Sequence, residues 1–214
     1  DIFTALMIND IFMRRVKENG VWSLMCPKLC PNLLDKYGDE FDKAYLEYES
    51  KGQYVRQVRA EDLWFKIMEL LIEPGRAYIL YKDTINRKSN QINSGVINSS
   101  NLCTEIVQIS TANEYAVCNL ASICLPTFIS DGKFDYDLLC AISRVLARNL
   151  NRIIDINYYP VPETRYSNMK HRPMAIGVQG LANVFSILRI PFDSEEAREI
   201  NKKIFETIYF GAMS

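Results

Sequence analysis

No hydrophobic run in this sequence is long enough to cross a membrane. The most apolar stretch, residues 116–129, is interrupted by Asn119, Ser122 and Pro126, whereas a transmembrane helix needs about 18 or more apolar residues. The first residues also lack the basic start and apolar middle of a secretory signal. We therefore expect a soluble, cytoplasmic protein without a membrane partner.

The sequence also lacks an excess of either charge. Its 25 lysines and arginines face 26 aspartates and glutamates, which leaves a formal net charge of −1. Nucleic-acid-binding domains carry a basic excess that neutralises phosphates, so we expect no nucleic-acid partner. Apolar residues at 48% and charged residues at 24% exclude a disordered or collagen-like chain.

Cysteine and histidine are scarce. Six cysteines in 214 residues are too few for a disulfide-stapled scaffold. Cys26 and Cys30 form a C-x3-C spacing, but no second close pair completes a zinc site, so we expect loop packing and no metal. Cys124 and Cys140 lie in apolar patterns and are expected to be buried. We expect a structural role for the single histidine, His171, rather than acid-base catalysis.

Two other motifs have a structural and a functional interpretation. Residues 177–180 (GVQG) match neither of the common phosphate-loop patterns, so we expect a strand-to-helix turn there. Tyr158 and Tyr159 could in principle relay a radical, but they stand beside prolines. Packing of a loop is the simpler interpretation.

No repeat, low-complexity tract or linker divides the sequence, whose length fits one large domain or part of one. The chain starts at Asp1 without a methionine and stops at Ser214 soon after a helical pattern. We therefore expect a segment of a longer protein.

Hydrophobic periodicity in the first half predicts three helices and one strand. Helices are expected over residues 2–16, over 33–48 with a break at Gly38, and over 61–72; a short aromatic strand is expected over 78–81.

The second half mixes strands and helices. Strands are expected over 102–110, 115–120 and 174–178, and a helix over 181–188. A long helix is expected to follow Asp135 and to bury Leu138, Ile142, Val145, Leu146, Leu150 and Ile153. A last helix opens with a capping-box-like D-x-x-E at 193–196 and presents Ala197, Ile200, Ile204 and Ile208. This alternation predicts an α/β fold, part of a parallel or mixed barrel or sheet.

The segment 99–106 carries the most informative chemistry. If it is extended, Asn101, Cys103 and Glu105 point to the same side, about 6.6 Å apart at a rise of about 3.3 Å per residue. An amide can hold a hydroxyl, a carboxylate can take its proton, and a thiol can act on the carbon between them. On the pattern alone, a strand edge with chance polar alternation is the simpler interpretation.

Short strings spread along the whole chain carry a resemblance to a known family. They are WSLMCP (22–27), YKD (81–83), NRKSN (86–90), SNLCTEI (100–106), AVCNLAS (116–122), NYYPVP (157–162), HRP (171–173), IGVQGL (176–181) and FETIY (205–209). Together, and in this order, they closely resemble the large subunit of class I ribonucleotide reductases, in the eukaryotic and large-DNA-virus branch.

The resemblance implies a fold and a set of site residues. Residues 1–214 would be the central part of the catalytic domain, a ten-stranded α/β barrel with an active-site finger loop. Cys103 would become a thiyl radical that removes the 3′ hydrogen of a ribonucleoside diphosphate. Glu105 would take the proton of the 3′ hydroxyl, and Asn101 would bind and polarise the substrate. Cys118 would be one of two thiols that supply the reducing electrons. Homolysis of an S–H bond also requires that Cys103 be a free thiol at rest.

The same resemblance implies partners that the segment itself does not contain. A separate small subunit with a metal-radical cofactor would deliver the radical, ATP and deoxynucleotides would act as effectors, and thioredoxin or glutaredoxin would be the reductant. The large subunit would form a homodimer. The second reducing cysteine, the relay tyrosines and the shuttle thiols would lie outside residues 1–214, so we do not expect the segment to turn over alone.

Two alternatives from other classes stay open at this point. One is an inactive paralogue that serves as a nucleotide-binding or scaffold subunit, although such a subunit gains nothing from keeping Asn101, Cys103, Glu105 and Cys118. The other is a thiol hydrolase with Cys103 as nucleophile, which would need a base such as the distant His171.

Overall fold

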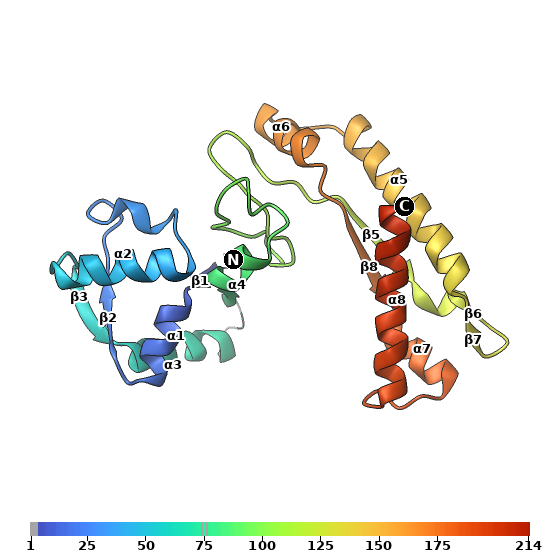
Figure 1. Cartoon of the computed structure of the whole chain (residues 1–214), viewed down its shortest axis with the longest axis horizontal. Helices are drawn as coiled ribbons and strands as arrows, with labels where there is room; N and C mark the ends of the chain where they lie inside the picture. The colour runs from blue at the N-terminus through green and yellow to red at the C-terminus, as the bar shows by residue number, and fades with distance from the viewer. Residues whose placement is uncertain (1–3, 74, 76) are drawn as a thin grey trace. The chain divides into compact units, whose positions relative to one another are not determined.

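The computed structural model describes residues 4–73, 75 and 77–214, which fold as two compact units, residues 1–113 and 114–214 (Figure 1). The first unit contains, in order, β1 (Thr4–Ile8), α1 (Asp10–Lys17), β2 (Val21–Leu24), the 3-10 turn η1 (Pro31–Leu33), α2 (Gly38–Ser50), β3 (Arg56–Arg59), α3 (Ala60–Ile72), β4 (Ala77–Tyr81) and α4 (Lys82–Lys88).

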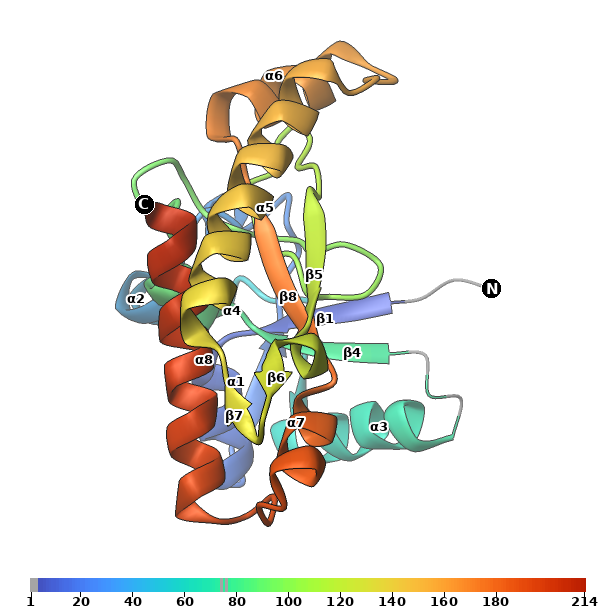
Figure 2. The same cartoon turned by 90° about the vertical axis from the view of Figure 1, so that its right-hand side faces the viewer.

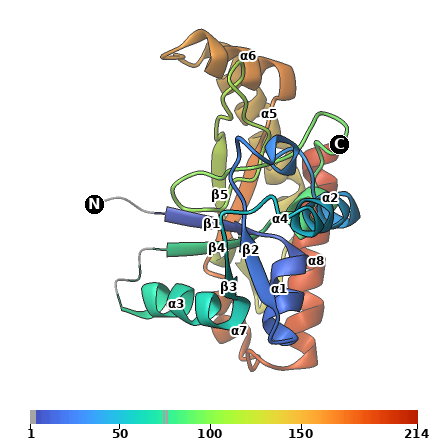
Figure 3. The same ribbon diagram turned by 90° about the vertical axis from the view of Figure 1, so that its left-hand side faces the viewer.

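Two small sheets organise the first unit. β1 and β4 pair in parallel, from Thr4 opposite Ala77 to Ile8 opposite Tyr81, and Figure 3 shows them side by side. β2 and β3 pair antiparallel. Helices α1 and α3 pack together over a core of Ile8, Phe12, Ala60 and Ile67. The predictions of a helix over 61–72 and a strand over 78–81 are confirmed by α3 and β4.

The helix expected over residues 2–16 is wrong in its first half. Residues 4–8 form β1, and α1 begins only at Asp10; residues 2 and 3 lie outside the described part of the chain. Apolar residues in this stretch suit either period, and the parallel pairing with β4 decides for a strand. The cationic end of the helix is as expected, with Arg14, Arg15 and Lys17 in its last turn.

Gly38 begins a helix instead of interrupting one. α2 runs over Gly38–Ser50, and the residues before it form the short turn η1. The backbone N–H of Gly38 donates to the buried Asp83 carboxylate at 2.7 Å. An N–H in the first helical turn has no partner within its own helix, so this tertiary hydrogen bond fixes the start of α2.

The second unit is built around one parallel strand pair and two long helices. It contains β5 (Leu120–Cys124), the 3-10 turn η2 (Leu125–Phe128), β6 (Ile129–Ser130), β7 (Lys133–Phe134), α5 (Tyr136–Ile156), α6 (Pro162–His171), β8 (Ala175–Gln179), α7 (Leu181–Leu188) and α8 (Glu195–Met213). Figure 2 shows β5 beside β8 and α5 beside α8. The predicted strand at 174–178 and helix at 181–188 are confirmed by β8 and α7.

The caps and the buried faces of α5 and α8 refine the sequence prediction. Asp135 is the N-cap of α5, as expected, and Ser194 rather than Asp193 caps α8. The predicted face of α8 is confirmed at Ala197, Ile204 and Ile208. On α5 the predicted face is largely wrong: Leu138, Ile142, Val145 and Ile153 are exposed in this unit, and the buried residues are Leu139, Ser143, Ala147, Leu150 and Ile154. The small side chain of Ser143 allows α8 to approach closely at Gly211.

Gly211 marks the closest approach of α8 to α5. A Cβ at this position would lie 2.5 Å from the carbonyl oxygen of Cys140 and 3.0 Å from Cβ of Ser143. Gly211→Ala should therefore destabilise the protein by about 1–3 kcal/mol, although alanine favours an isolated helix by about 1 kcal/mol. Chemical denaturation of the full-length chain measures this difference, and a more stable variant would contradict the close approach.

Candidate active site

The segment that carries Cys103 is an irregular loop with buried ends. Between α4 and β5 the structure contains no regular helix or strand, and Ile97 and Ile109 are 0% and 2% exposed. Between these two anchors the chain rises to an exposed tip that contains Leu102, Cys103 and Glu105. The site is therefore a loop held at its base.

A second set of contacts closes the neck of this loop. Asn101 Oδ1 accepts a hydrogen bond from the Ile106 backbone N–H at 3.0 Å. The Ser100 hydroxyl donates to the Ile106 carbonyl at 2.6 Å. At the tip, the Thr104 N–H donates to the Asn101 carbonyl at 3.1 Å, and Thr104 has a positive φ of 64°. A β-branched residue rarely adopts that conformation, so the surrounding contacts impose the turn.

The strands expected over 102–110 and 115–120 are wrong. Residues 102–104 form a turn, and the only strand residue of the second range is Leu120, where β5 begins. The strict alternation predicted for Asn101, Cys103 and Glu105 is lost with the strand. The three residues still share one short loop: Asn101 at the neck with its carbonyl oxygen engaged, and Cys103 and Glu105 exposed at the tip. Cys103 is a free thiol, as expected.

A cavity of about 330 Å³ adjoins the loop. One wall is the face of the β1–β4 pair that presents Ala5, Met7, Tyr78 and Leu80, and the other is the loop itself, residues 98–102 and 104. The lining mixes apolar strand residues with backbone and polar groups of the loop. A small polar ligand in this space would lie directly against Asn101.

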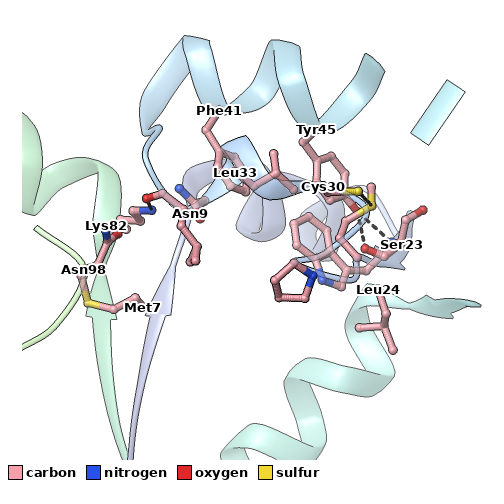
Figure 4. A pocket seen from close by; sticks show the side chains of 14 residues that line it. Met7, Asn9, Ser23, Leu24, Cys30, Leu33, Phe41, Tyr45, Lys82 and Asn98 are labelled. Carbon is pink, nitrogen blue, oxygen red and sulfur yellow. Dashed lines mark hydrogen bonds between the residues drawn. The ribbon is translucent and has the colours of Figure 1, made fainter. Parts of the chain in front are cut away.

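A neighbouring cavity of about 370 Å³ is more apolar. Figure 4 shows Leu33, Phe41 and Tyr45 along one side, with Asn9, Lys82 and Asn98 gathered at one end. Burial raises the pKa of Tyr45 to about 12, so its hydroxyl stays protonated. Burial lowers the pKa of Lys82, whose ammonium donates to the Leu34 carbonyl at 2.8 Å. Met7 and Asn98 line both cavities.

Cys118 belongs to the second unit, on the exposed side of the segment that leads into β5. One residue later, the buried Asn119 donates to Asn168 Oδ1 at 2.6 Å and to the Pro173 carbonyl at 2.8 Å. Before it, the Tyr115 N–H donates to the Glu163 carbonyl at 3.3 Å. The segment that carries this thiol is thus fastened to α6 on both sides of Cys118.

Glu114 adds an ionic contact to that attachment. Its side chain is 9% exposed and lies 3.1 Å from Lys170 Nζ and 3.0 Å from His171 Nε2. Burial raises the pKa of Glu114, but the hydrogen bonds from Lys170 and His171 outweigh burial and hold this pKa below its ordinary value. His171 therefore takes part in a structural contact.

The lowered pKa of Glu114 has a measurable consequence. A carboxyl group with a depressed folded-state pKa stabilises the protein above its unfolded pKa, about 4.3 for glutamate, and loses that contribution as the pH falls through the folded pKa. Glu114→Gln should therefore lower the thermal midpoint at pH 7 and have little effect near pH 3. A midpoint difference that grows on acidification would contradict this assignment.

Most of the other sequence candidates have structural explanations; the packing expected for Tyr158 is wrong, since this residue is exposed. Cys30 is buried beneath Gln53 and Met25, and burial raises the pKa of its thiol. Tyr159 packs through hydrogen bonds to the Ile154 carbonyl and Asn168, and Gly180 turns the chain from β8 into α7 with a φ of 80°. The expectation of buried filler is wrong for Cys124, which is exposed on β5; Cys140 is half-buried.

The described residues contain neither a candidate metal site nor a membrane-spanning helix. Among residues 4–73, 75 and 77–214, no three histidine, cysteine, aspartate or glutamate side chains are grouped so that they could hold a metal. Over the same residues, no helix combines the length and apolarity needed to span a membrane.

Sequence reasoning missed three buried polar residues whose hydrogen bonds hold neighbouring backbone segments in place. Asp83, Asn86 and Asn119 are 0%, 2% and 5% exposed. Two of them lie in strings quoted above, YKD and NRKSN, and the third in AVCNLAS. A polar side chain within an apolar pattern is the signal that could have found Asn119; for the other two, only the tertiary hydrogen bonds reveal their role.

Known proteins match this chain along its whole length. A family model described as "Ribonucleotide reductase, barrel domain" matches residues 1–214. Three curated relatives are named ribonucleoside-diphosphate reductase large subunit: those of Acanthamoeba polyphaga mimivirus (62% identical over 218 residues), Variola virus isolate Human/India/Ind3/1967 (57% over 213) and Danio rerio (54% over 214). Each match covers 100% of this chain but only 25%, 28% and 27% of the relative. The chain thus spans about a quarter of their length.

Proposed function

The chain belongs to the ribonucleotide reductase barrel-domain family, and from this premise we propose that the full-length protein reduces ribonucleoside diphosphates to deoxyribonucleoside diphosphates. One observation carries the proposal: a free thiol, Cys103, stands two residues from the Glu105 carboxylate at the exposed tip of a loop that borders a cavity of mixed polar and apolar lining. A thiol and a base that belong to the same short loop suit hydrogen-atom and proton removal from one sugar carbon.

Cys103, Glu105 and Cys118 have distinct roles in this reaction. The Cys103 thiyl radical takes the 3′ hydrogen atom, which reforms the S–H bond and leaves a radical on C3′. Glu105 takes the proton of the 3′ hydroxyl, and the 2′ hydroxyl leaves as water with a proton from one of two thiols. The two thiols, Cys118 being one, supply that proton, the hydrogen that replaces the hydroxyl on C2′ and two electrons, and they become a disulfide, while Glu105 returns its proton to the 3′ oxygen. Cys103 then returns a hydrogen atom to C3′ and is a thiyl radical again.

Asn101 can act on the substrate only through part of its amide. Its Oδ1 already accepts from the Ile106 N–H, so a bound nucleotide would accept hydrogen bonds from Nδ2. The same side chain thus closes the loop and faces the ligand, which ties substrate binding to the position of Cys103.

The partners follow from the same proposal. A small subunit with a metal-radical cofactor supplies the oxidising equivalent, thioredoxin or glutaredoxin reduces the disulfide, and the large subunit works as a cytoplasmic homodimer under control by ATP and deoxynucleotides. Within this scheme residues 1–214 are the central part of the catalytic barrel, and the names of the relatives support both the substrate class and the existence of a small subunit.

The proposal is tested with the full-length chain and its radical-bearing small subunit. Each ribonucleoside diphosphate is incubated with a dithiol reductant, and deoxynucleotide formation is followed by chromatography. We expect turnover that requires both subunits. Nucleotide binding without turnover, with the small-subunit radical verified spectroscopically, would instead favour an inactive nucleotide-binding paralogue.

A further inference from the structure

The start of the active-site loop is fixed by a single buried amide on α4. Asn86 Oδ1 accepts from the Ile97 N–H at 2.7 Å, and its Nδ2 donates to the Ile97 carbonyl at 3.0 Å and to the Lys82 carbonyl at 2.9 Å. Asn86 is 2% exposed and Ile97 is fully buried. These paired hydrogen bonds fix the backbone direction at Ile97 as well as its depth.

The end of the loop is fixed by a different side chain. Gln91 Oε1 accepts from the Ile109 N–H at 2.9 Å, and Ile109 is 2% exposed. Burial of the Ile109 side chain fixes how far this residue lies below the surface, but it leaves the backbone free to rotate. The hydrogen bond to Gln91 prevents this rotation at Ile109, four residues after Glu105.

The loop between these anchors has no regular secondary structure to stiffen it. Its geometry depends on the Asn86 contact at one end, the Gln91 contact at the other, and the Ser100 and Asn101 bonds to Ile106 in between. A hydrogen-atom transfer is sensitive to the separation of the reacting atoms, and a misplacement of about 1 Å can cost about a hundredfold in rate.

We propose that Gln91 is a positioning residue for the radical chemistry: its side-chain carbonyl holds Ile109 and thereby sets the placement of Cys103 and Glu105 at the loop tip. This inference rests on the proposed reductase function. Gln91 is not among the residues that line the cavity, and its side chain accepts from the Ile109 N–H, so it acts through the backbone of the loop.

The test compares two variants of nearly equal size in the full-length chain with its small subunit. Gln91→Met removes the acceptor, whereas Gln91→Glu keeps an acceptor oxygen. We expect Gln91→Met to lower kcat by about 10- to 100-fold with KM changed by less than about threefold, and Gln91→Glu to recover most of kcat. Gln108→Met, the same change one residue before Ile109, at a side chain that makes none of the loop contacts described above, should keep wild-type kcat.

A second readout does not depend on turnover. Hydrogen–deuterium exchange of the full-length chain reports the backbone N–H groups of residues 97–109, and Gln91→Met should accelerate it where Gln91→Glu does not. Equal kcat values and equal exchange for the two Gln91 variants would overturn the inference. An inactive wild type would overturn the proposed function instead. Even in that case, unchanged exchange in Gln91→Met would show that Gln91 does not hold Ile109.

Discussion

Replacing Cys103 by serine should abolish deoxynucleotide formation by the full-length chain while leaving nucleotide binding largely intact. Serine matches the size of cysteine, but its O–H bond is far harder to cleave homolytically than S–H. Each additional 1.4 kcal/mol of barrier, roughly, slows a reaction tenfold, so even a fraction of this bond-strength difference removes measurable turnover. The measurement is product formation with the radical-bearing small subunit, alongside nucleotide binding by calorimetry.

A matched control comes from a second exposed cysteine. Cys124 lies on β5 in the other unit, has no assigned step and is solvent-accessible, so Cys124→Ser should retain wild-type turnover. An unchanged rate in Cys103→Ser would rule out the radical mechanism proposed above. Loss of nucleotide binding in that variant would show instead that the substitution had disturbed the loop.

Much of the fold is readable from hydrophobic periodicity. The boundaries of α3, β8 and α7 agree with the predicted ranges to within one residue, because each has one clear period and a glycine or proline near an end. The α/β class is confirmed, and the family match confirms a barrel-domain fragment.

The failures occur where tertiary contacts choose between two patterns that the sequence allows. Residues 4–8 can continue a helix or pair as a strand, and the pairing with β4 decides. On α5 the residues with the largest apolar side chains were expected inside, but α8 packs over Ser143 because a small residue permits close helix contact. The size of the apolar side chains favoured one face of α5 for burial, whereas packing against α8 buries another.

The conformation of the predicted site segment could not be read from the sequence. An amide, a thiol and a carboxylate drew attention to residues 101–105, yet residues 102–104 form a turn rather than a strand. The turn depends on Asn101 and Ser100 bonding to Ile106, and on Asn86 and Gln91 bonding outside it. Such side-chain-to-backbone bonds have no periodic signature, so the sequence could not reveal them.

Asp83 should be the most sensitive position for folding of the first unit. The residue is fully buried, and its carboxylate accepts from Asn9 Nδ2 at 2.8 Å, from the Asp10 N–H at 2.6 Å and from the Gly38 N–H at 2.7 Å. Asp10 and Gly38 are the first residues of α1 and α2, whose N–H groups lack partners within their helices. One carboxylate from α4 thus caps two other helices, at ends where the helix dipole favours negative charge.

Removing this carboxylate leaves three donors without their acceptor. Asp83→Ala should lower the free energy of unfolding by about 3–6 kcal/mol, since a hydrogen bond to a charged group contributes about 1.5–3 kcal/mol and water replaces part of it. Asp83→Asn keeps one oxygen but turns an N–H₂ group toward a donor, so it should cost about half as much. Chemical denaturation of the full-length chain, with hydrogen–deuterium exchange at residues 9–12 and 38–41, measures both effects.

The control for this prediction stands in the first turn of α2. Asp39 is exposed there, so Asp39→Ala removes a favourable charge near the same helix start and should cost no more than about 1 kcal/mol. If Asp83→Ala destabilised the protein no more than Asp39→Ala, the carboxylate would not be holding α1 and α2 together. Because α4 also carries Asn86, a true loss at Asp83 should in addition speed exchange at Ile97, which would connect the folding of this unit to the placement of Cys103.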